Sequence, residues 1–175
     1  MSLTLVLGGA RSGKSGYAQA KAEAWARAQG VIPTFIATAT ADDAEMAERI
    51  ARHQVDRAGL WRTLEAPLAL ADALAGLGPD DVAVVDCLTL WLSNAMAEAP
   101  DLDARIEALV SALSACKARL WVVSNEVGWG IVPDNALARR FRDIAGHLHQ
   151  TIARVADEAM LIVAGLPVTL KQRPD

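Results

Sequence analysis

The fold is decided by the stretch Gly8-Gly9-Ala10-Arg11-Ser12-Gly13-Lys14-Ser15, which matches the phosphate-binding pattern G-x-x-x-x-G-K-[ST] at every fixed position. An apolar run, Leu3–Leu7, precedes it, and an alanine-rich amphipathic stretch, 14–29, follows it. In this strand–loop–helix context, backbone N–H groups and the helix N-terminus face a bound phosphate. We therefore expect a nucleoside triphosphate here. Lys14 would reach its β- and γ-phosphates from a solvated pocket, and the Ser15 hydroxyl would ligate Mg²⁺.

Short apolar runs alternate with longer amphipathic runs along the chain. Strands are expected at 3–7, 34–37, 82–86, 120–124 and 160–164, with a weaker candidate at 61–64. Helices are expected at 14–29, 42–55, 67–76, 88–98, 102–117 and 134–157. This alternation predicts an α/β fold with a doubly wound, mostly parallel sheet flanked by helices. A turn at Gly165, followed by Pro167, predicts a C-terminal β-hairpin with its second strand at the sheet edge.

Composition favours one domain, residues 1–175, because 53% of the 175 residues are hydrophobic. Seventeen basic and 21 acidic residues give a formal charge of −4, so nucleic acid is not expected as a partner. Cys87 and Cys116 are expected to be buried thiols, since two cysteines make no disulfide framework. No apolar stretch is long enough to span a membrane and no signal peptide is evident, so we expect a cytoplasmic protein.

A second motif, Val82–Asp86, consists of four apolar strand residues that end in an acid. Many strands end in aspartate at a loop, so this pattern alone is not specific. Beside a phosphate-binding loop it indicates a Walker B strand, in which Asp86 holds Mg²⁺ directly or through water.

His53 lies in a predicted helix and has two interpretations from its spacing. Met46, Ile50 and His53 fall on one helix face, which favours a half-buried histidine packed among apolar neighbours. Alternatively, its neutral imidazole attacks a nucleotide phosphate and forms a covalent intermediate.

Polar residues follow the predicted strand 120–124, where ligands bind in open α/β sheets. Asn125 and Glu126 are therefore candidates for substrate contacts. The alternative is a plain strand-to-helix loop with Asp134 as the N-cap of the next helix. In that helix His147 and His149 are two residues apart and share no face, so they are not expected to form a metal pair.

These stretches together resemble the bifunctional adenosylcobinamide kinase/adenosylcobinamide-phosphate guanylyltransferases of cobalamin biosynthesis. The resemblance covers essentially the whole chain and rests on four blocks in order, within 8–15, 36–53, 86–94 and 125–146. It implies a P-loop NTPase-like (RecA-like) fold and a homotrimer. It also implies two reactions: phosphorylation of adenosylcobinamide by ATP or GTP, and transfer of GMP from GTP to adenosylcobinamide phosphate, giving adenosylcobinamide-GDP.

The resemblance also assigns roles to residues. It implies that His53 carries the GMP in a covalent intermediate. The nucleotide contacts that it implies are Gly8–Ser15, Thr38, Ala39, Thr40, Gln54, Val55, Asp56, Arg57, Glu65 and Asp86. The sequence departs from the family pattern at Ala58, where proline is usual, and at His149, where asparagine is usual.

Two other classes of protein share part of this pattern. A monofunctional P-loop kinase for a small metabolite needs the two nucleotide motifs but not His53. A nucleotide-dependent regulator or chaperone would hydrolyse the triphosphate to switch a partner protein. A covalent, acid-labile GMP adduct is expected of the bifunctional enzyme alone.

Overall fold

The structure is a computed structural model that describes residues 2–40, 59–98 and 101–172. Its strands are β1 (Ser2–Gly8), β2 (Thr34–Ala37), β3 (Arg62–Glu65), β4 (Val82–Asp86), β5 (Arg119–Asn125), β6 (Glu158–Val163) and β7 (Leu166–Lys171). Its helices are α1 (Lys14–Gln29), α3 (Leu70–Ala75), α4 (Leu88–Glu98), α5 (Leu102–Ala115) and α6 (Ala136–Val155).

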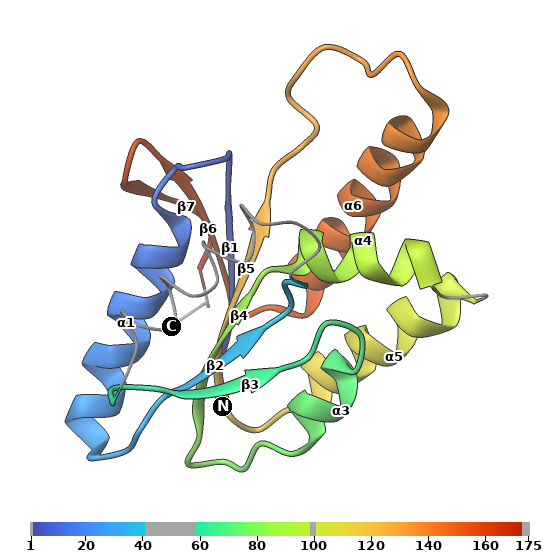
Figure 1. Cartoon of the computed structure of the whole chain (residues 1–175). Coiled ribbons are helices and arrows are strands. Elements are labelled where there is room, and N and C mark those ends of the chain that lie inside the picture. The colour runs from blue at the N-terminus through green and yellow to red at the C-terminus, as the bar shows by residue number, and fades with distance from the viewer. Residues whose placement is uncertain (1, 41–58, 99–100, 173–175) are drawn as a thin grey trace.

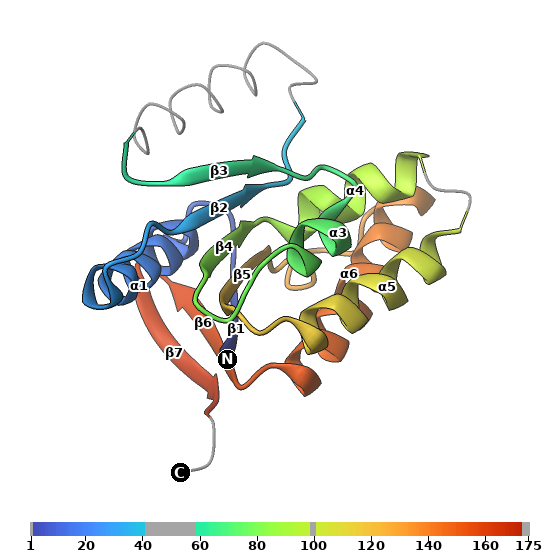
Figure 2. The same ribbon diagram turned by 90° about the horizontal axis from the view of Figure 1, so that it is seen from below.

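In the described part of the chain, seven strands form one sheet in the order β3-β2-β4-β5-β1-β6-β7. Every neighbouring pair is parallel except β6 and β7, which form an antiparallel hairpin. Helix α1 covers one face of the sheet, and α3, α4, α5 and α6 lie on the other (Figures 1 and 2). These observations confirm the predicted doubly wound, mostly parallel sheet and its C-terminal hairpin.

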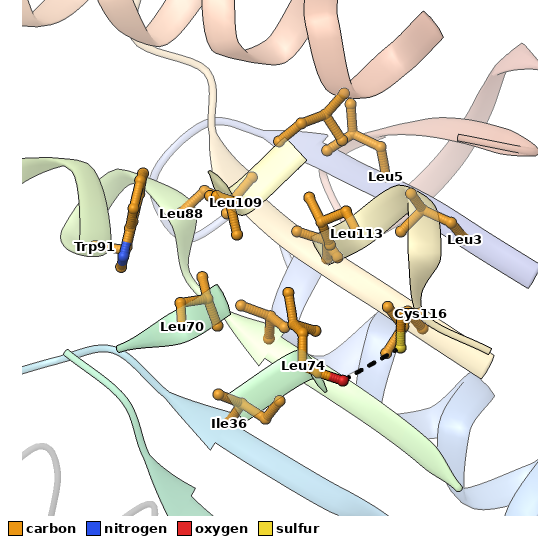
Figure 3. Close-up of a cluster of buried hydrophobic side chains, with 14 of the residues drawn as sticks. Leu3, Leu5, Ile36, Leu70, Leu74, Leu88, Trp91, Leu109, Leu113 and Cys116 are labelled. Atoms are coloured by element: carbon orange, nitrogen blue, oxygen red, sulfur yellow. Dashed lines mark hydrogen bonds between the residues drawn. The ribbon is translucent and has the colours of Figure 1, made fainter. Parts of the chain in front are cut away.

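The strands are apolar on both faces because each face lies against a helical layer. In β1, Leu5 packs into the core beneath α3 to α6, whereas its neighbour Val6 packs toward α1. The larger core joins Trp91 with leucines of β1, α3, α4 and α5 (Figure 3). The smaller core contains Ala18, Ala22 and Ala26, one residue per turn on the inner face of α1. Alanines here let that helix lie close to the sheet.

The predicted elements agree with the structure to within a few residues where it describes them. The weaker strand candidate at 61–64 is confirmed as β3, and both cysteines are buried free thiols. The predicted helix 42–55 lies outside the described residues. The prediction of Asp134 as an N-cap is wrong by one position: the Asn135 side chain accepts a 2.7 Å hydrogen bond from the Ala138 N–H. No helix among the described residues is long and apolar enough to cross a membrane.

Replacing Leu5 tests the central position of β1. Leu5 is fully buried, so Leu5→Ala is expected to lower the free energy of unfolding by about 2–5 kcal/mol through lost transfer energy and a cavity. Ile32→Ala is the control, because Ile32 is 69% exposed and its truncation should change stability by less than about 0.5 kcal/mol. Urea denaturation measures both, and equal midpoints for the two variants would contradict the core assignment.

Candidate nucleotide site

The loop between β1 and α1 is shaped by backbone conformations that few residues adopt. Gly13, the N-cap of α1, has a φ of 94°, and its carbonyl accepts the Tyr17 N–H at 2.9 Å. Arg11 also has a positive φ, 55°. Glycine at position 13 takes this conformation without steric cost. The loop therefore turns sharply and leaves the first N–H groups of α1 pointing out of the sheet edge, where they can face an anion.

Gly8 has no room for a side chain. A Cβ there would clash with Ser12 Oγ and lie 2.7 Å from the backbone carbonyl oxygen of Ile162. Ser12 Oγ itself is buried and has no hydrogen-bond partner among the described residues. A tight backbone turn that contains a buried hydroxyl without a hydrogen-bond partner is consistent with a loop that closes around a polar group such as a phosphate.

The turn of the β6–β7 hairpin supports this loop from the far end of the chain. The Gly165 N–H donates a 2.8 Å hydrogen bond to the Ser12 carbonyl. A Cβ on Gly13 would lie only 3.2 Å from Gly165 Cα, so the two glycines allow a close approach of the two backbones. Figure 1 shows the hairpin turn beside the loop that leads into α1. The hairpin is thus part of the wall of the candidate site.

Lys14 begins α1 and is 7% exposed, so the expectation of a solvated lysine is wrong. Its ammonium donates a 2.9 Å hydrogen bond to the Gly9 carbonyl. A buried ammonium needs acceptors, and a loop carbonyl supplies one. The charge therefore lies against the loop that the motif predicts to hold phosphates.

Thr38 joins the end of β2 to the end of β4. Its hydroxyl donates to the Cys87 carbonyl and accepts from the Cys87 N–H, both at 2.7 Å, and its own N–H donates to the Asp86 carbonyl at 3.3 Å. The side chain is fully buried, so in this structure it fixes the backbone beside Asp86. Its contact with a nucleotide stays a prediction.

Charges from both nucleotide motifs affect the pKa of the Cys87 thiol. Burial raises the pKa of its thiol and the Asp86 carboxylate raises it further, whereas hydrogen bonds from Thr89 and Leu90 and the Lys14 charge lower it. The Asp86 and Lys14 charges thus act on this thiol in opposite directions. The raised pKa keeps Cys87 a neutral thiol, which is a poor nucleophile.

Asn125 is the last residue of β5, the strand between β1 and β4, and Glu126 follows it directly. The Asn125 amide nitrogen donates to Thr89 Oγ1 at 2.8 Å, which ties the end of β5 to the start of α4. The Glu126 N–H donates to the Gly8 carbonyl at 2.9 Å. Both predicted substrate residues therefore lie at the sheet edge between the two motifs, and Glu126 is anchored to the phosphate loop itself.

His149, one of the two departures from the family pattern, lies in this site, although no spacing pattern assigned it a role there. Its Nε2 lies 2.7 Å from Ser124 Oγ, and its Nδ1 lies 4.0 Å from Glu126 Oε2. Burial lowers the pKa of His149, and the Glu126 carboxylate opposes this shift. A signal existed: Ala145, Leu148, His149 and Ile152 are the buried face of α6, so this histidine interrupts an apolar stripe.

The predicted site residues form two groups. Glu65 ends β3, which lies four strand spacings from β1, about 19 Å across the sheet. Thr38, Ala39 and Thr40 follow β2, next to β3, with β4 on its other side. Glu65 and the phosphate loop thus cannot hold the same phosphate group. His53 and Gln54–Arg57 lie outside the described residues.

A phosphate loop of this kind, at the carboxyl edge of a parallel sheet with a Walker B strand, defines a P-loop nucleotide-binding protein. Comparison with protein families makes the assignment specific. The chain belongs to the cobinamide kinase/cobinamide phosphate guanyltransferase family, whose model matches residues 4–170.

Curated relatives match over nearly the full length. The chain is 47% identical over 173 residues to the bifunctional adenosylcobalamin biosynthesis protein CobP of Pseudomonas aeruginosa, covering 97% of this chain and 98% of that protein. It is 40% identical over 187 residues to the bifunctional adenosylcobalamin biosynthesis protein CobU of Salmonella typhimurium, covering 97% and 99%.

A solved structure supports the fold class. The flagellar accessory protein FlaH of Methanocaldococcus jannaschii aligns with a TM-score of 0.54 at 13% identity, covering 98% of this chain and 79% of that one. At this identity the likeness concerns the fold alone.

Adding one methyl group at Gly8 tests the packing of the loop. Gly8→Ala is expected to shift the loop backbone, destabilise the protein by about 1–3 kcal/mol and weaken nucleotide binding at least tenfold. Gly16→Ala is the matched control, since a Cβ there meets no atom within 4 Å and alanine favours the helix. Calorimetric titration with Mg²⁺ and a non-hydrolysable GTP analogue measures binding. Similar affinities for both variants would contradict this account of the loop.

Proposed function

We propose that this chain performs both reactions of its family, phosphorylating adenosylcobinamide with ATP or GTP and then transferring GMP from GTP to adenosylcobinamide phosphate. The observation that carries the proposal is the complete phosphate loop, with its buried lysine and Walker B strand, in a chain that matches the family over residues 4–170. The curated relatives, which are named as bifunctional enzymes, support it further.

The phosphoryl-transfer half uses the loop 8–15. Its backbone N–H groups and the N-terminus of α1 orient the triphosphate, and the Lys14 ammonium stabilises charge that develops on the transferred phosphoryl group. Ser15 and Asp86 would hold Mg²⁺, which supplies charge neutralisation when bound. One hydroxyl and one carboxylate fit this ion, because Mg²⁺ in such sites takes its other ligands from water and phosphate. No group of three or more His, Cys, Asp or Glu side chains gathers elsewhere in the described ranges to offer another metal site.

The guanylyl-transfer half uses His53 as nucleophile. Its neutral imidazole attacks the α-phosphorus of GTP, a P–N bond forms, and pyrophosphate leaves with the electron pair of the broken P–O bond. The phosphate of adenosylcobinamide phosphate then displaces the imidazole and takes the GMP. Contacts from Thr38, Ala39, Thr40, Glu65 and Gln54–Arg57 would bind the guanine nucleotide. The separation of Glu65 from the phosphate loop supports a division of the nucleotide contacts between two ends of the sheet edge.

The same proposal extends to the organisation of the protein. We expect a single 175-residue domain that acts in the cytoplasm as a homotrimer. Support for self-association comes from β7, an edge strand whose alternate residues Leu166, Val168 and Leu170 are exposed. Single apolar side chains on a surface are common, but a row along an edge strand favours a protein contact.

A labelled-GTP experiment tests the proposed function. Incubation with GTP labelled at the α-phosphorus should leave GMP bound to the protein through a phosphoramidate bond that is labile in acid and comparatively stable in base. His53→Ala should lose this adduct and guanylyl transfer, yet retain some phosphorylation of adenosylcobinamide, because the kinase reaction needs no histidine nucleophile.

His147→Ala is the control, because His147 is exposed on α6 and should not affect the adduct. A wild-type protein that phosphorylates the substrate without forming an adduct would instead be a monofunctional kinase. Labelled GMP on the His53→Ala protein would refute the assignment of the nucleophile.

A further inference from the structure

The backbone of Glu126 lies beside the phosphate loop, and its side chain brings a carboxylate to this edge of the sheet, where a bound triphosphate would repel it. Its N–H donates to the carbonyl of Gly8, the first residue of the loop, and this hydrogen bond fixes the Glu126 backbone next to the loop. A carboxylate next to a bound triphosphate raises the energy of both anions unless it holds a cation or accepts a proton. Asp86, at the end of β4, already serves as the expected carboxylate for Mg²⁺. The second carboxylate therefore needs another role.

The Glu126 side chain is held in one orientation. Oε1 accepts a 2.7 Å hydrogen bond from the Gly128 N–H, which turns Oε2 toward Nδ1 of His149 at 4.0 Å. The side chain keeps 20% of its surface exposed, whereas that of His149 keeps 8%. The Glu126 side chain can thus contact a substrate from the solvent, while the more buried His149 lies behind Glu126 on the protein side.

The two ring nitrogens of His149 face different partners. Nδ1 faces the Glu126 carboxylate at 4.0 Å, which is beyond hydrogen-bond distance, so the carboxylate favours hydrogen on Nδ1 through its charge alone. Nε2 lies 2.7 Å from Ser124 Oγ, and with hydrogen on Nδ1 it accepts from the Ser124 hydroxyl. Ser124 is fully buried, so this contact fixes the ring from the inside of the sheet edge. Ser124, His149 and Glu126 therefore lie in a row that begins with a fully buried residue and ends with a partly exposed one.

We propose that Glu126 is the general base of the phosphoryl-transfer step and that His149 is a positioning residue that aims its Oε2. The inference rests on the proposed kinase function. The acceptor alcohol gives its proton to Glu126 Oε2 as its oxygen forms a bond to the γ-phosphorus. The bond from the γ-phosphorus to the bridging oxygen breaks, and the nucleoside diphosphate leaves with that electron pair. Glu126 later releases the proton to solvent.

Glu126→Gln tests the general base, because the amide keeps the shape of the side chain and loses its basicity. The kcat for phosphorylation of the acceptor alcohol should fall by about 10²–10⁴-fold. The KM for ATP and the Mg²⁺ concentration at half-maximal rate should change by less than about threefold. Glu107→Gln is the control, since Glu107 is exposed on α5 and should leave all three values unchanged.

Formation of the GMP adduct is measured on the same samples and separates this inference from the function on which it rests. Wild-type protein that makes no adduct and does not phosphorylate the alcohol overturns the proposed function. Wild-type protein that does both, with an unchanged kcat in Glu126→Gln, overturns only the general base. A defect that saturating Mg²⁺ repairs would make Glu126 a metal ligand and would likewise overturn it.

Two amides at position 149 test the positioning role and avoid an empty cavity. Asparagine places its amide near the position of Nδ1 and keeps an N–H group facing Glu126, whereas glutamine places its amide near Nε2 and keeps the Ser124 contact. His149→Asn should therefore retain kcat within about threefold, and His149→Gln should lose about 10–100-fold with an unchanged KM. The reverse order, or equal losses in both variants, would show that His149 serves the fold and would overturn its positioning role.

Discussion

The close packing of backbone around Gly8 is the constraint on which the site depends. The missing side chain of Gly8 leaves space that Ser12 Oγ and the Ile162 carbonyl occupy, and its own carbonyl receives the Glu126 N–H. Strands β1, β5 and β6 thus all contact the loop at Gly8. The Gly165 N–H in the hairpin turn also donates a hydrogen bond to the Ser12 carbonyl. These contacts fix the loop backbone at Gly8 and Ser12 without a bound nucleotide. Such preorganised N–H groups need no rearrangement when charge develops on a phosphate.

The sheet order then distributes the chemistry along one edge. Strand β5 lies between the strand that leads to the phosphate loop and the strand that ends in Asp86, so Glu126 stands between the two motifs. The Thr38 hydroxyl is hydrogen-bonded to the backbone of Cys87, and the Asn125 amide donates to the Thr89 hydroxyl. These contacts hold the chain that follows β4 in place. Farther along, the ends of β2 and β3 present the residues predicted to bind the guanine nucleotide. One edge of one sheet can therefore accommodate a phosphoryl transfer and a nucleotidyl transfer without a second domain.

Much of this arrangement was predictable from the sequence, because local patterns carry it. The G-x-x-x-x-G-K-[ST] loop, the apolar runs and the Gly165 turn each depend on residues close together in the chain, and the structure confirms the elements they predict. The contacts that the sequence did not reveal join distant residues: Gly165 with Ser12, and His149 with Ser124 and Glu126. No spacing rule connects positions in different elements, so those pairs required the fold. The burial of Lys14 was also unexpected, since it depends on how tightly the loop folds back over its own helix.

Amide hydrogen exchange tests the central claim, that the loop 8–15 is the nucleotide cradle and the hairpin turn is part of its wall. Mg²⁺ and a non-hydrolysable GTP analogue are added, and exchange is compared with that of the free protein. The account predicts slower exchange at residues 9–15 and at Gly165, with no change at the exposed face of α5, because binding suppresses local opening where the ligand contacts the backbone. Unchanged exchange at residues 9–15 in protein shown to bind the analogue would contradict it.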